Sequence, residues 1–431
     1  MKLTTIIQNI NTWIIILGLI FIHQAKAQDI SYPYSILQFP FIDYQHNVID
    51  FPSDSNQFDI ISQKLNRMIL EGEGKLTILQ IGGSHIQADI YSNVARYRLQ
   101  HFYPGLDAGR GFVFPYAIAK TNNPVNIKVE YTGQWDGCRN VQKNKTCFLG
   151  LAGISVSTSD SSASFKIYSY ESYHSYDFNH ITLFYNLDSS SYRPVLAYSE
   201  LIDSIYSDTL RGFQTIYYKQ YIDTFALSLE KVDTFQRPFV FYGADLQTND
   251  PGVVYHSIGI NGASIPSFLR CQLFEQQLSV LSPDLVILSI GTNDAYGKTF
   301  DPEVYFNNYD TLIQRILKAV PNTALMITVP NDDYLYKRRP NPHTALQEKE
   351  IYLLAKKYHA GVWNLYKIMG GFNSSQVWYN YGLMKYDRIH FTKDGYLLKG
   401  DLFFNAFLKM YDSFIESKLS KNSLLDIGTN N

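Results

Sequence analysis

Three short segments of the chain carry residue types that could together perform nucleophilic catalysis. Ser84 follows two glycines, and Asp387 stands three residues before His390. Asn293 and Asp294 follow a glycine and a threonine in a third segment. A serine hydroxyl beside a histidine base is the pair used in covalent acyl transfer, and a nearby carboxylate can fix the tautomer of the histidine. An asparagine amide can donate to the negative oxygen that forms in such a reaction.

Each segment on its own also has a plain structural explanation. A serine after glycines is a common helix N-cap, and Asp-x-x-His occurs as a helix cap or a surface pair. Asparagine and aspartate are ordinary loop residues, and a single glycine such as Gly262 usually marks a turn. The catalytic interpretation therefore depends on whether the fold brings these segments together.

The segment before Ser84 predicts a buried strand that ends in a sharp turn. Five of the six residues from 76 to 81 are apolar or β-branched, and Gly82 and Gly83 follow them. Residues 86–101 then carry apolar side chains at helical spacing. This order places Ser84 at the N-terminus of a helix, where free N–H groups and the helix dipole favour developing negative charge.

Strands and helices alternate elsewhere in the chain, which predicts a three-layer α/β domain with a mostly parallel sheet. Further strands are expected at residues 253–258, 284–290, 324–329 and 360–364, and helices at 58–70, 266–281, 304–319, 344–358 and 395–419. Ligands bind at the carboxyl ends of the strands in such sheets. Gly262 and Asn293 follow two of these strands, so we expect both residues near Ser84.

Residues 113–245 have a different texture, in which strand signals dominate and no helical pattern intervenes. Strands are expected at residues 125–131, 154–158, 164–170, 180–185, 212–221 and 224–229. Short strands separated by turns rich in Ser, Asp, Asn and Gly are typical of an antiparallel sandwich. The sequence therefore predicts an inserted β-sandwich between two parts of the α/β domain.

The composition and the N-terminal residues indicate where the protein is located and which partners are unexpected. Of the 431 residues 45% are hydrophobic and 18% charged, and the net charge of −2 makes nucleic acid an unexpected partner. Residues 1–27 read as a signal peptide, with Lys2, an apolar run at 13–22 and a cleavage site at Ala25-Lys-Ala27. That run is short for a membrane span, although a retained anchor is the alternative. We expect an exported protein, periplasmic or secreted, with no integral membrane segment after cleavage.

The chain has three cysteines, and their spacing fits no zinc site. Cys138 and Cys147 stand nine residues apart in a polar segment and could close a small disulfide in an oxidising compartment. Cys271 falls in a helix-like segment and is expected to be a buried free thiol. No metal and no cofactor are expected.

Taken together and in this order, the motifs resemble the SGNH (GDSL-type) hydrolase superfamily. The resemblance covers residues 58–111 and 246–417. It implies a flavodoxin-like three-layer fold and a triad in which Ser84 is the nucleophile, His390 the general base and Asp387 the residue that orients it. It also implies an oxyanion hole formed by the backbone N–H groups of Ser84 and Gly262 and the side-chain amide of Asn293. In the family an aspartate usually precedes the serine, where this chain has Gly83.

The finer resemblance is to bacterial peptidoglycan O-acetylesterases of this superfamily, which carry a jelly-roll, carbohydrate-binding-like module in the place of residues 113–245. The phrase Gly109-Arg-Gly-Phe112, Trp378 and the pair Gly382-Leu383 also look like that group. Tyr131, Trp135 and the tyrosines within 168–176 could stack on sugar rings, although packing in the sandwich core is the expectation for most of them.

The sequence thus predicts an exported serine esterase that removes O-acetyl groups from a cell-wall glycan. The expected parts are a signal peptide (1–27), an arm and the first part of the hydrolase domain (28–112), the inserted sandwich (113–245), the second part of the hydrolase domain (246–417) and a tail (418–431). The alternatives are an esterase for another acylated polysaccharide or lipid, acetyl transfer to a sugar, and a catalytically impaired glycan-binding protein. Asp294 is expected to brace its loop, and Asp89, Asp332 and Asp333 to be solvated carboxylates.

Overall fold

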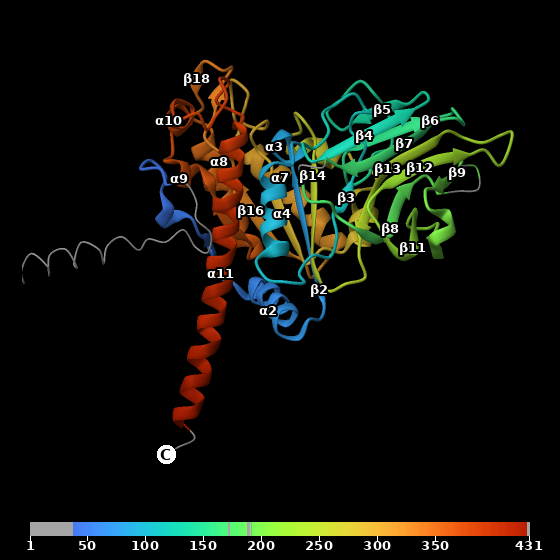
Figure 1. The fold of residues 1–431 in the computed structure, drawn as a ribbon. Helices are drawn as coiled ribbons and strands as arrows, with labels where there is room; N and C mark the ends of the chain where they lie inside the picture. Colours follow the sequence, from blue (N-terminus) through green and yellow to red (C-terminus); the bar gives the residue numbers. More distant parts are fainter. Residues whose placement is uncertain (1–37, 171–172, 188–189, 191, 429–431) are drawn as a thin grey trace, which may run out of the picture. The chain divides into compact units, whose positions relative to one another are not determined.

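A computed structural model describes residues 38–170, 173–187, 190 and 192–428 of the protein (Figure 1). The expected signal peptide lies outside these residues. The described part contains a six-stranded sheet, here called sheet A, with the order β1-β19-β16-β15-β2-β14. Its strands are β1 (Ile49–Asp50), β2 (Lys75–Gly82), β14 (Gly252–Gly259), β15 (Leu285–Ser289), β16 (Ala324–Val329) and β19 (Gly361–Asn364).

Sheet A has the flavodoxin-like topology that the family resemblance implied. All its strands except β1 run parallel, and β1 pairs with β19 in antiparallel register through Ile49 and Trp363. Numbered along the chain, the parallel strands stand side by side in the order 2-1-3-4-5. The strand order of such a sheet reverses between its first and third strands, here β2 and β15, and ligands bind outside that point. The predicted α/β fold is therefore confirmed.

Helices cover the two faces of sheet A (Figure 1). One group consists of α11 (Lys393–Gly428) and the two helices that contact it, α2 (Asn56–Glu71) and α4 (Tyr91–His101). The other group packs around α7: α5 (Ile265–Leu269), α6 (Phe274–Leu281), α7 (Pro302–Ala319) and α8 (Thr344–Tyr358). The shorter elements are η1 (Tyr44–His46), α3 (Ser84–Gln87), η2 (Ser199–Leu201), β17 (Tyr334–Leu335), β18 (Arg339–Pro340), α9 (Leu365–Met369) and α10 (Ser374–Asn380).

Two antiparallel sheets form the second part of the fold. Sheet B contains β3 (Gly111–Val113), β5 (Asp136–Arg139), β6 (Ile154–Thr158), β8 (Phe178–Tyr185), β10 (Ile202–Asp208), β11 (Phe213–Ile222) and β13 (Phe239–Gln247). Sheet C contains β4 (Ile127–Thr132), β7 (Ser164–Ser169), β9 (Arg193–Leu196) and β12 (Phe225–Glu230).

These two sheets pack on each other as the predicted sandwich. Phe165 and Phe225 of sheet C contact Phe241 of sheet B, with ring centroids 5.1 and 6.3 Å away. All strands of both sheets lie between β2 and β14 in the sequence, so the sandwich interrupts the α/β part. The exact domain boundaries at residues 113 and 245 stay a prediction.

Two helices expected as continuous are broken, in each case by a buried tertiary contact. The helix expected at residues 86–101 is split into α3 and α4 at Asp89, which has a φ of 46°. The carboxylate of Asp89 is bound there by Arg96 and Arg110. The helix expected at 266–281 is split into α5 and α6, because the guanidinium of Arg315 binds the carbonyl oxygens at the end of α5.

The sequence analysis missed β13, which lies in the middle of sheet B. Its side chains are buried on both faces, so it has no polar and apolar alternation. Cys138 and Cys147 form a disulfide, and Cys271 is a buried free thiol as expected. Within the described residues, none of the helices combines the length and the apolar character that a membrane crossing requires.

Candidate active site

Ser84 stands where β2 turns into α3, at the carboxyl edge of sheet A. Gly82 makes this turn possible, because a Cβ there would lie 2.3 Å from Ile86 Cγ1 and 2.5 Å from the Ser289 carbonyl oxygen. Gly83 is different, because a Cβ would lie at an ordinary 3.6 Å from both the Ala263 carbonyl oxygen and the Asn293 amide nitrogen. The tight turn therefore requires the first glycine and leaves room for a side chain at the second.

A chain of hydrogen bonds joins the three residues that the sequence singled out. Ser84 Oγ lies 3.0 Å from His390 Nε2, although the two residues are 306 positions apart. His390 Nδ1 lies 2.9 Å from Asp387 Oδ2. The carboxylate accepts a hydrogen bond from Nδ1–H, so the neutral imidazole keeps its proton on Nδ1 and presents its Nε2 lone pair to the serine hydroxyl. The structure thus brings the predicted nucleophile, base and orienting residue together.

Asp387 is itself held in place by its own loop. Its Oδ1 accepts the backbone N–H groups of Ile389 and His390, both at 3.0 Å. Burial opposes ionisation of this carboxyl, but the hydrogen bonds from the His390 side chain and from these two backbone groups outweigh it and lower its pKa. A carboxylate held in this way can orient the imidazole and favour the protonated form of the ring during a reaction.

The predicted oxyanion donors face the same cleft as Ser84. Ser84 is the first residue of α3, so its N–H has no partner within the helix. Gly262 has a φ of +80°, and no atom lies within 4 Å of the place that a Cβ would take. Asn293 Nδ2 donates one hydrogen to the Ala263 carbonyl at 2.9 Å, which leaves its second amide hydrogen for a ligand.

Asp294 braces the loop of Asn293, as expected. Its two carboxylate oxygens accept the backbone N–H of Ile265 at 3.1 and 3.2 Å, which ties the end of β15 to the start of α5. Burial raises the pKa of Asp294 to about 7. Gly262 and Asn293 lie on the two loops joined in this way, so Asp294 fixes the spacing between two of the oxyanion donors.

The cleft has a volume of about 630 Å³ and is lined by groups from both parts of the fold. The predicted residues Ser84, Gly262, Asn293 and His390 line it, together with Asn261, which precedes Gly262 in a loop that the sequence also indicated. Residues that the sequence did not indicate line it as well: Gln87, Asn122, Asn123, Tyr296, Lys385 and Tyr396. Asn122 and Asn123 lie between β3 and β4, in a segment whose sequence shows only a turn. No sequence pattern places such a segment beside Ser84.

Gln87 of α3 holds that segment against the α/β part. Its Nε2 donates to Thr121 Oγ1 at 3.0 Å and to the Asn122 carbonyl at 2.7 Å. Its Oε1 accepts the backbone N–H of Asn261 at 2.6 Å. The wall of the cleft is therefore built jointly by the α/β part and the segment that leads into the sandwich.

His85 packs behind the base, and the sequence analysis did not single it out. Its ring centroid lies 5.2 Å from that of His390, and its Nδ1 lies 2.8 Å from the Tyr396 hydroxyl. Burial holds the pKa of His85 well below its usual value. A neutral His85 adds a packing surface for His390 without adding a competing charge.

Three aspartates expected to be solvated are buried, so that expectation is wrong. Asp89, Asp332 and Asp333 are each at most 1% exposed, and none of them lines the cleft. Asp89 pairs with two arginines, while Asp332 and Asp333 are hydrogen-bonded to neighbouring loops. Their carboxylates hold the loops around the site and have no access to a ligand.

The aromatic side chains of the sandwich that were expected to pack mostly in its core differ widely in exposure. Trp135 packs against Phe165 with ring centroids 5.9 Å apart, and Tyr176 is buried. Tyr131 and Tyr170 are 50% and 44% exposed, so neither of these two rings is buried in the core.

Residues 226–398 match the model of the GDSL-like Lipase/Acylhydrolase family. The match contains Gly262, Asn293, Asp387 and His390, and it lies C-terminal to Ser84 and to most of the sandwich. Ser84 lies outside the matched residues in the sequence. In the structure, β2 places it beside them. The match supports the expected family over residues 226–398, and with it the expected class of carboxylic ester hydrolases. No curated protein matches the chain.

Several solved structures are similar to this chain over all or part of its length. One, titled as a peptidoglycan O-acetylesterase in action, has a TM-score of 0.68 and 21% identity, and the likeness covers 86% of this chain and 99% of that one. A lipase/acylhydrolase from Enterococcus faecalis has a TM-score of 0.30 and 21% identity, covering 38% of this chain and 78% of that one. An acetyl xylan esterase has a TM-score of 0.29 and 21% identity, covering 36% and 81%.

Proposed function

We propose that this chain is an exported serine esterase that removes O-acetyl groups from a cell-wall glycan, with peptidoglycan as the first candidate. The match of residues 226–398 to the GDSL-like Lipase/Acylhydrolase family supports the class of reaction. The observation that carries the proposal is the hydrogen-bonded series Ser84, His390 and Asp387 at the edge of an open cleft. This series supplies a nucleophile, a base and a fixed carboxylate in the order that acyl transfer needs.

The proposed reaction has two halves. In the first, Ser84 Oγ attacks the acetyl carbonyl carbon while His390 Nε2 takes the serine proton, and the N–H groups of Ser84, Gly262 and Asn293 hold the oxyanion. The bond to the sugar oxygen then breaks, and His390 returns the proton to that oxygen. In the second half, His390 takes a proton from water as the water oxygen attacks the acetyl-serine. Acetate leaves, and the proton returns to Ser84.

Two observations support a glycan as the substrate. The cleft is lined by Asn122, Asn123, Asn261 and Tyr296, which are residue types that suit the hydroxyls of a sugar. The fold neighbour that spans both the α/β part and the sandwich is named a peptidoglycan O-acetylesterase. The acetyl ester of a cell-wall sugar is therefore the substrate class that we propose.

Export is part of the proposal. Residues 1–27 have the pattern of a signal peptide, and a protein that acts on a cell wall must leave the cytoplasm. The disulfide between Cys138 and Cys147 suits an oxidising compartment. We place the mature protein in the periplasm or outside the cell.

Acetate release tests the reaction and the substrate together. Wild type and Ser84→Ala are incubated with O-acetylated peptidoglycan and, in parallel, with acetylated xylan. The proposal predicts release from peptidoglycan that disappears in the variant. Release from xylan alone would keep the reaction and replace the substrate. Release from neither, nor from a small activated acetyl ester, would favour the glycan-binding alternative that the glycine at position 83 raised.

A further inference from the structure

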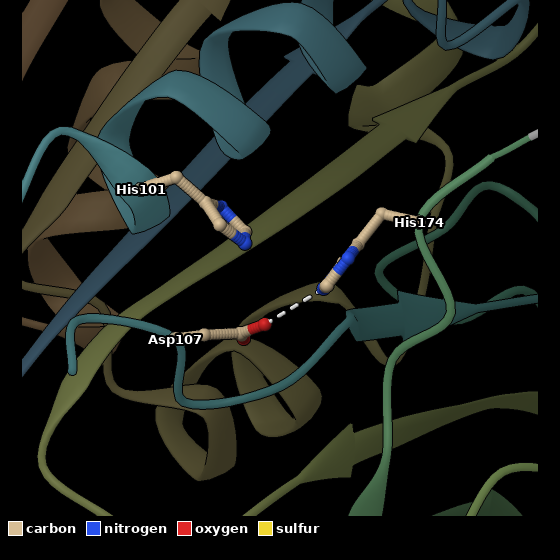
Figure 2. A group of neighbouring side chains, drawn as sticks. All are labelled: His101, Asp107 and His174. Carbon is tan, nitrogen blue, oxygen red and sulfur yellow. Dashed lines mark hydrogen bonds and ion pairs between the residues drawn. The ribbon is translucent and has the colours of Figure 1, made fainter. Parts of the chain in front are cut away.

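A second cluster of chemically capable side chains lies outside the cleft, at the end of α4 (Figure 2). His101 is the last residue of α4, Asp107 lies in the loop that leads to β3, and His174 lies in the segment that leads to β8. Each of the three offers one ligand atom, and these atoms all lie within 4.8 Å of one another. None of the three residues lines the cleft of Ser84.

The ring of His101 is held in the tautomer that a metal ligand needs. Its Nδ1 lies 2.8 Å from the carbonyl oxygen of Tyr97, which can only accept a hydrogen bond. The proton is therefore on Nδ1, and the neutral ring has its lone pair on Nε2. The ring of Tyr97 also stacks on His101, with centroids 4.2 Å apart. A backbone carbonyl that fixes the far nitrogen in this way is the usual support of a metal-binding histidine.

Asp107 and His174 are oriented toward each other. Asp107 Oδ1 accepts the backbone N–H of Gly109 at 2.9 Å, which turns Oδ2 toward His174 Nε2 at 3.0 Å. The rings of His101 and His174 meet nearly at right angles, with centroids 4.7 Å apart, so neither ring covers the other. Tyr176 packs edge-on against His174 and fixes the other side of that ring.

We propose that His101, Asp107 and His174 bind one divalent transition-metal ion, with Zn²⁺ as the representative. Two imidazole nitrogens and one carboxylate oxygen are a donor set of zinc sites, whereas Ca²⁺ and Mg²⁺ prefer oxygen donors alone. Bonds of about 2.0–2.1 Å require the ligand atoms to draw closer together around the ion. The ion replaces the hydrogen bond between Asp107 and His174. Neutral His174 then binds through the Nε2 lone pair of the tautomer that carries its proton on Nδ1, and water carries that proton from Nε2 to Nδ1. The three side chains are partly or fully exposed, so the ion can enter from solvent and keep water as a further ligand.

Such an ion would join the two parts of the fold. His101 and Asp107 belong to the α/β part, and His174 precedes a strand of the sandwich. Two residues beyond His174, the ring of Tyr176 lies over the Arg110 guanidinium at 5.9 Å, and Arg110 binds the buried Asp89 at 2.6 Å. The metal would therefore fix the segment of His174 and Tyr176 to the α/β part. This segment covers the buried ion pair of Arg110 and Asp89 at the turn between α3 and α4.

Zinc titration of the full chain without a histidine tag tests the site. The protein is freed of metal by dialysis against a chelator, and binding is measured by calorimetry and by competition with a chromophoric chelator. We expect one equivalent of Zn²⁺ in wild type, and an affinity at least tenfold lower in His101→Gln and His174→Gln. His46→Gln is the matched control, because exposed His46 pairs with Asp43 but belongs to no three-ligand group among the described residues. It should bind zinc like wild type.

Melting curves with and without zinc distinguish the loss of a metal ligand from misfolding of a variant. Nδ1 of His101 is hydrogen-bonded to the Tyr97 carbonyl oxygen of its own helix, so metal-free His101→Gln should melt like metal-free wild type. Zinc should raise the melting temperature of wild type and of His46→Gln, and leave that of His101→Gln unchanged. Asp107→Asn keeps an oxygen for Gly109 and should also bind zinc more weakly. Equal zinc affinity in wild type, His101→Gln and His174→Gln, or no binding by wild type, would overturn the proposal.

Discussion

The chemistry that we propose depends on two hydrogen bonds, one on each side of a single imidazole ring. His390 is 3.0 Å from Ser84 Oγ and 2.9 Å from Asp387 Oδ2, and two backbone N–H groups keep Asp387 ionised and aligned. Removing the charge of Asp387 while keeping its size therefore tests the role of the carboxylate separately from packing.

We predict that Asp387→Asn lowers kcat on an activated acetyl ester by about 10⁴-fold, because the amide allows the wrong imidazole tautomer and does not stabilise the imidazolium. The variant should keep the melting temperature of the wild type within a few degrees. Asp394→Asn, an exposed change in the first turn of α11, is the control and should leave kcat unchanged. A loss smaller than tenfold in Asp387→Asn would argue against this role.

The side-chain amide of Asn293 gives a second prediction at this scale. Asn293→Ala should lower kcat by about 10²–10³-fold, or about 2.7–4 kcal/mol of barrier, with little change in KM, because the lost donor acts on the oxyanion. Steady-state kinetics of this variant are compared with those of Asn307→Ala on the exposed side of α7. An effect confined to KM would show that Asn293 binds the substrate instead.

At the scale of elements, the strands that carry the site could be predicted because their apolar runs end at the loops that hold Ser84, Gly262 and Asn293. The strands expected at 76–81, 253–258 and 284–290 correspond to β2, β14 and β15 within about one residue at each end. The helix breaks could not be predicted, because they depend on distant partners. Asp89 meets Arg110, and α5 ends at the guanidinium of Arg315.

Asp294 links two such elements, and its titration should be visible in the stability of the protein. Burial raises the pKa of Asp294 to about 7 from 3.8. Its contribution to the free energy of unfolding is therefore fully present below about pH 4, where the carboxyl is protonated in both the folded and the unfolded protein. Its contribution is lost as the pH rises to about 7, because the unfolded state ionises first. We predict that Asp294→Asn gains unfolding free energy relative to wild type between pH 4 and pH 7, by about 1.4 kcal/mol for each pH unit of the shift.

Urea unfolding of both proteins at pH 4.5, 6 and 8 measures this difference. A constant difference at the three pH values would contradict the raised pKa of Asp294. If the difference instead fell with rising pH, the carboxylate would be stabilised in the folded protein by the start of α5.

At the scale of the whole molecule, two groups of residues could not be foreseen because they come from separate segments. The asparagines that complete the cleft wall lie between β3 and β4 of the sandwich, and Gln87 holds their segment in place. His101, Asp107 and His174 come from a helix end and two loops. The cysteine spacing argued against a cysteine-based zinc site only, and it carried no information about this cluster.

The disulfide gives a prediction for the sandwich. Cys138 and Cys147 close a loop of nine positions. Replacing both by serine should lower the unfolding free energy by about 2–3 kcal/mol through the greater freedom of the unfolded chain. Thermal melting with and without reductant measures the effect. The reductant should lower the melting temperature of wild type and leave the double variant unchanged, and equal behaviour of the two proteins would contradict the contribution of the disulfide.

The central claim is that Ser84 is the nucleophile of an ester hydrolase, and one comparison tests it most directly. Hydrolysis of a small activated acetyl ester is measured for wild type, for Ser84→Ala and for Ser204→Ala, a change on the exposed strand β10. We predict that Ser84→Ala lowers kcat by about 10⁴-fold or more with an unchanged melting temperature, while Ser204→Ala behaves as wild type. Ester hydrolysis by Ser84→Ala at the rate of the wild type would contradict the account.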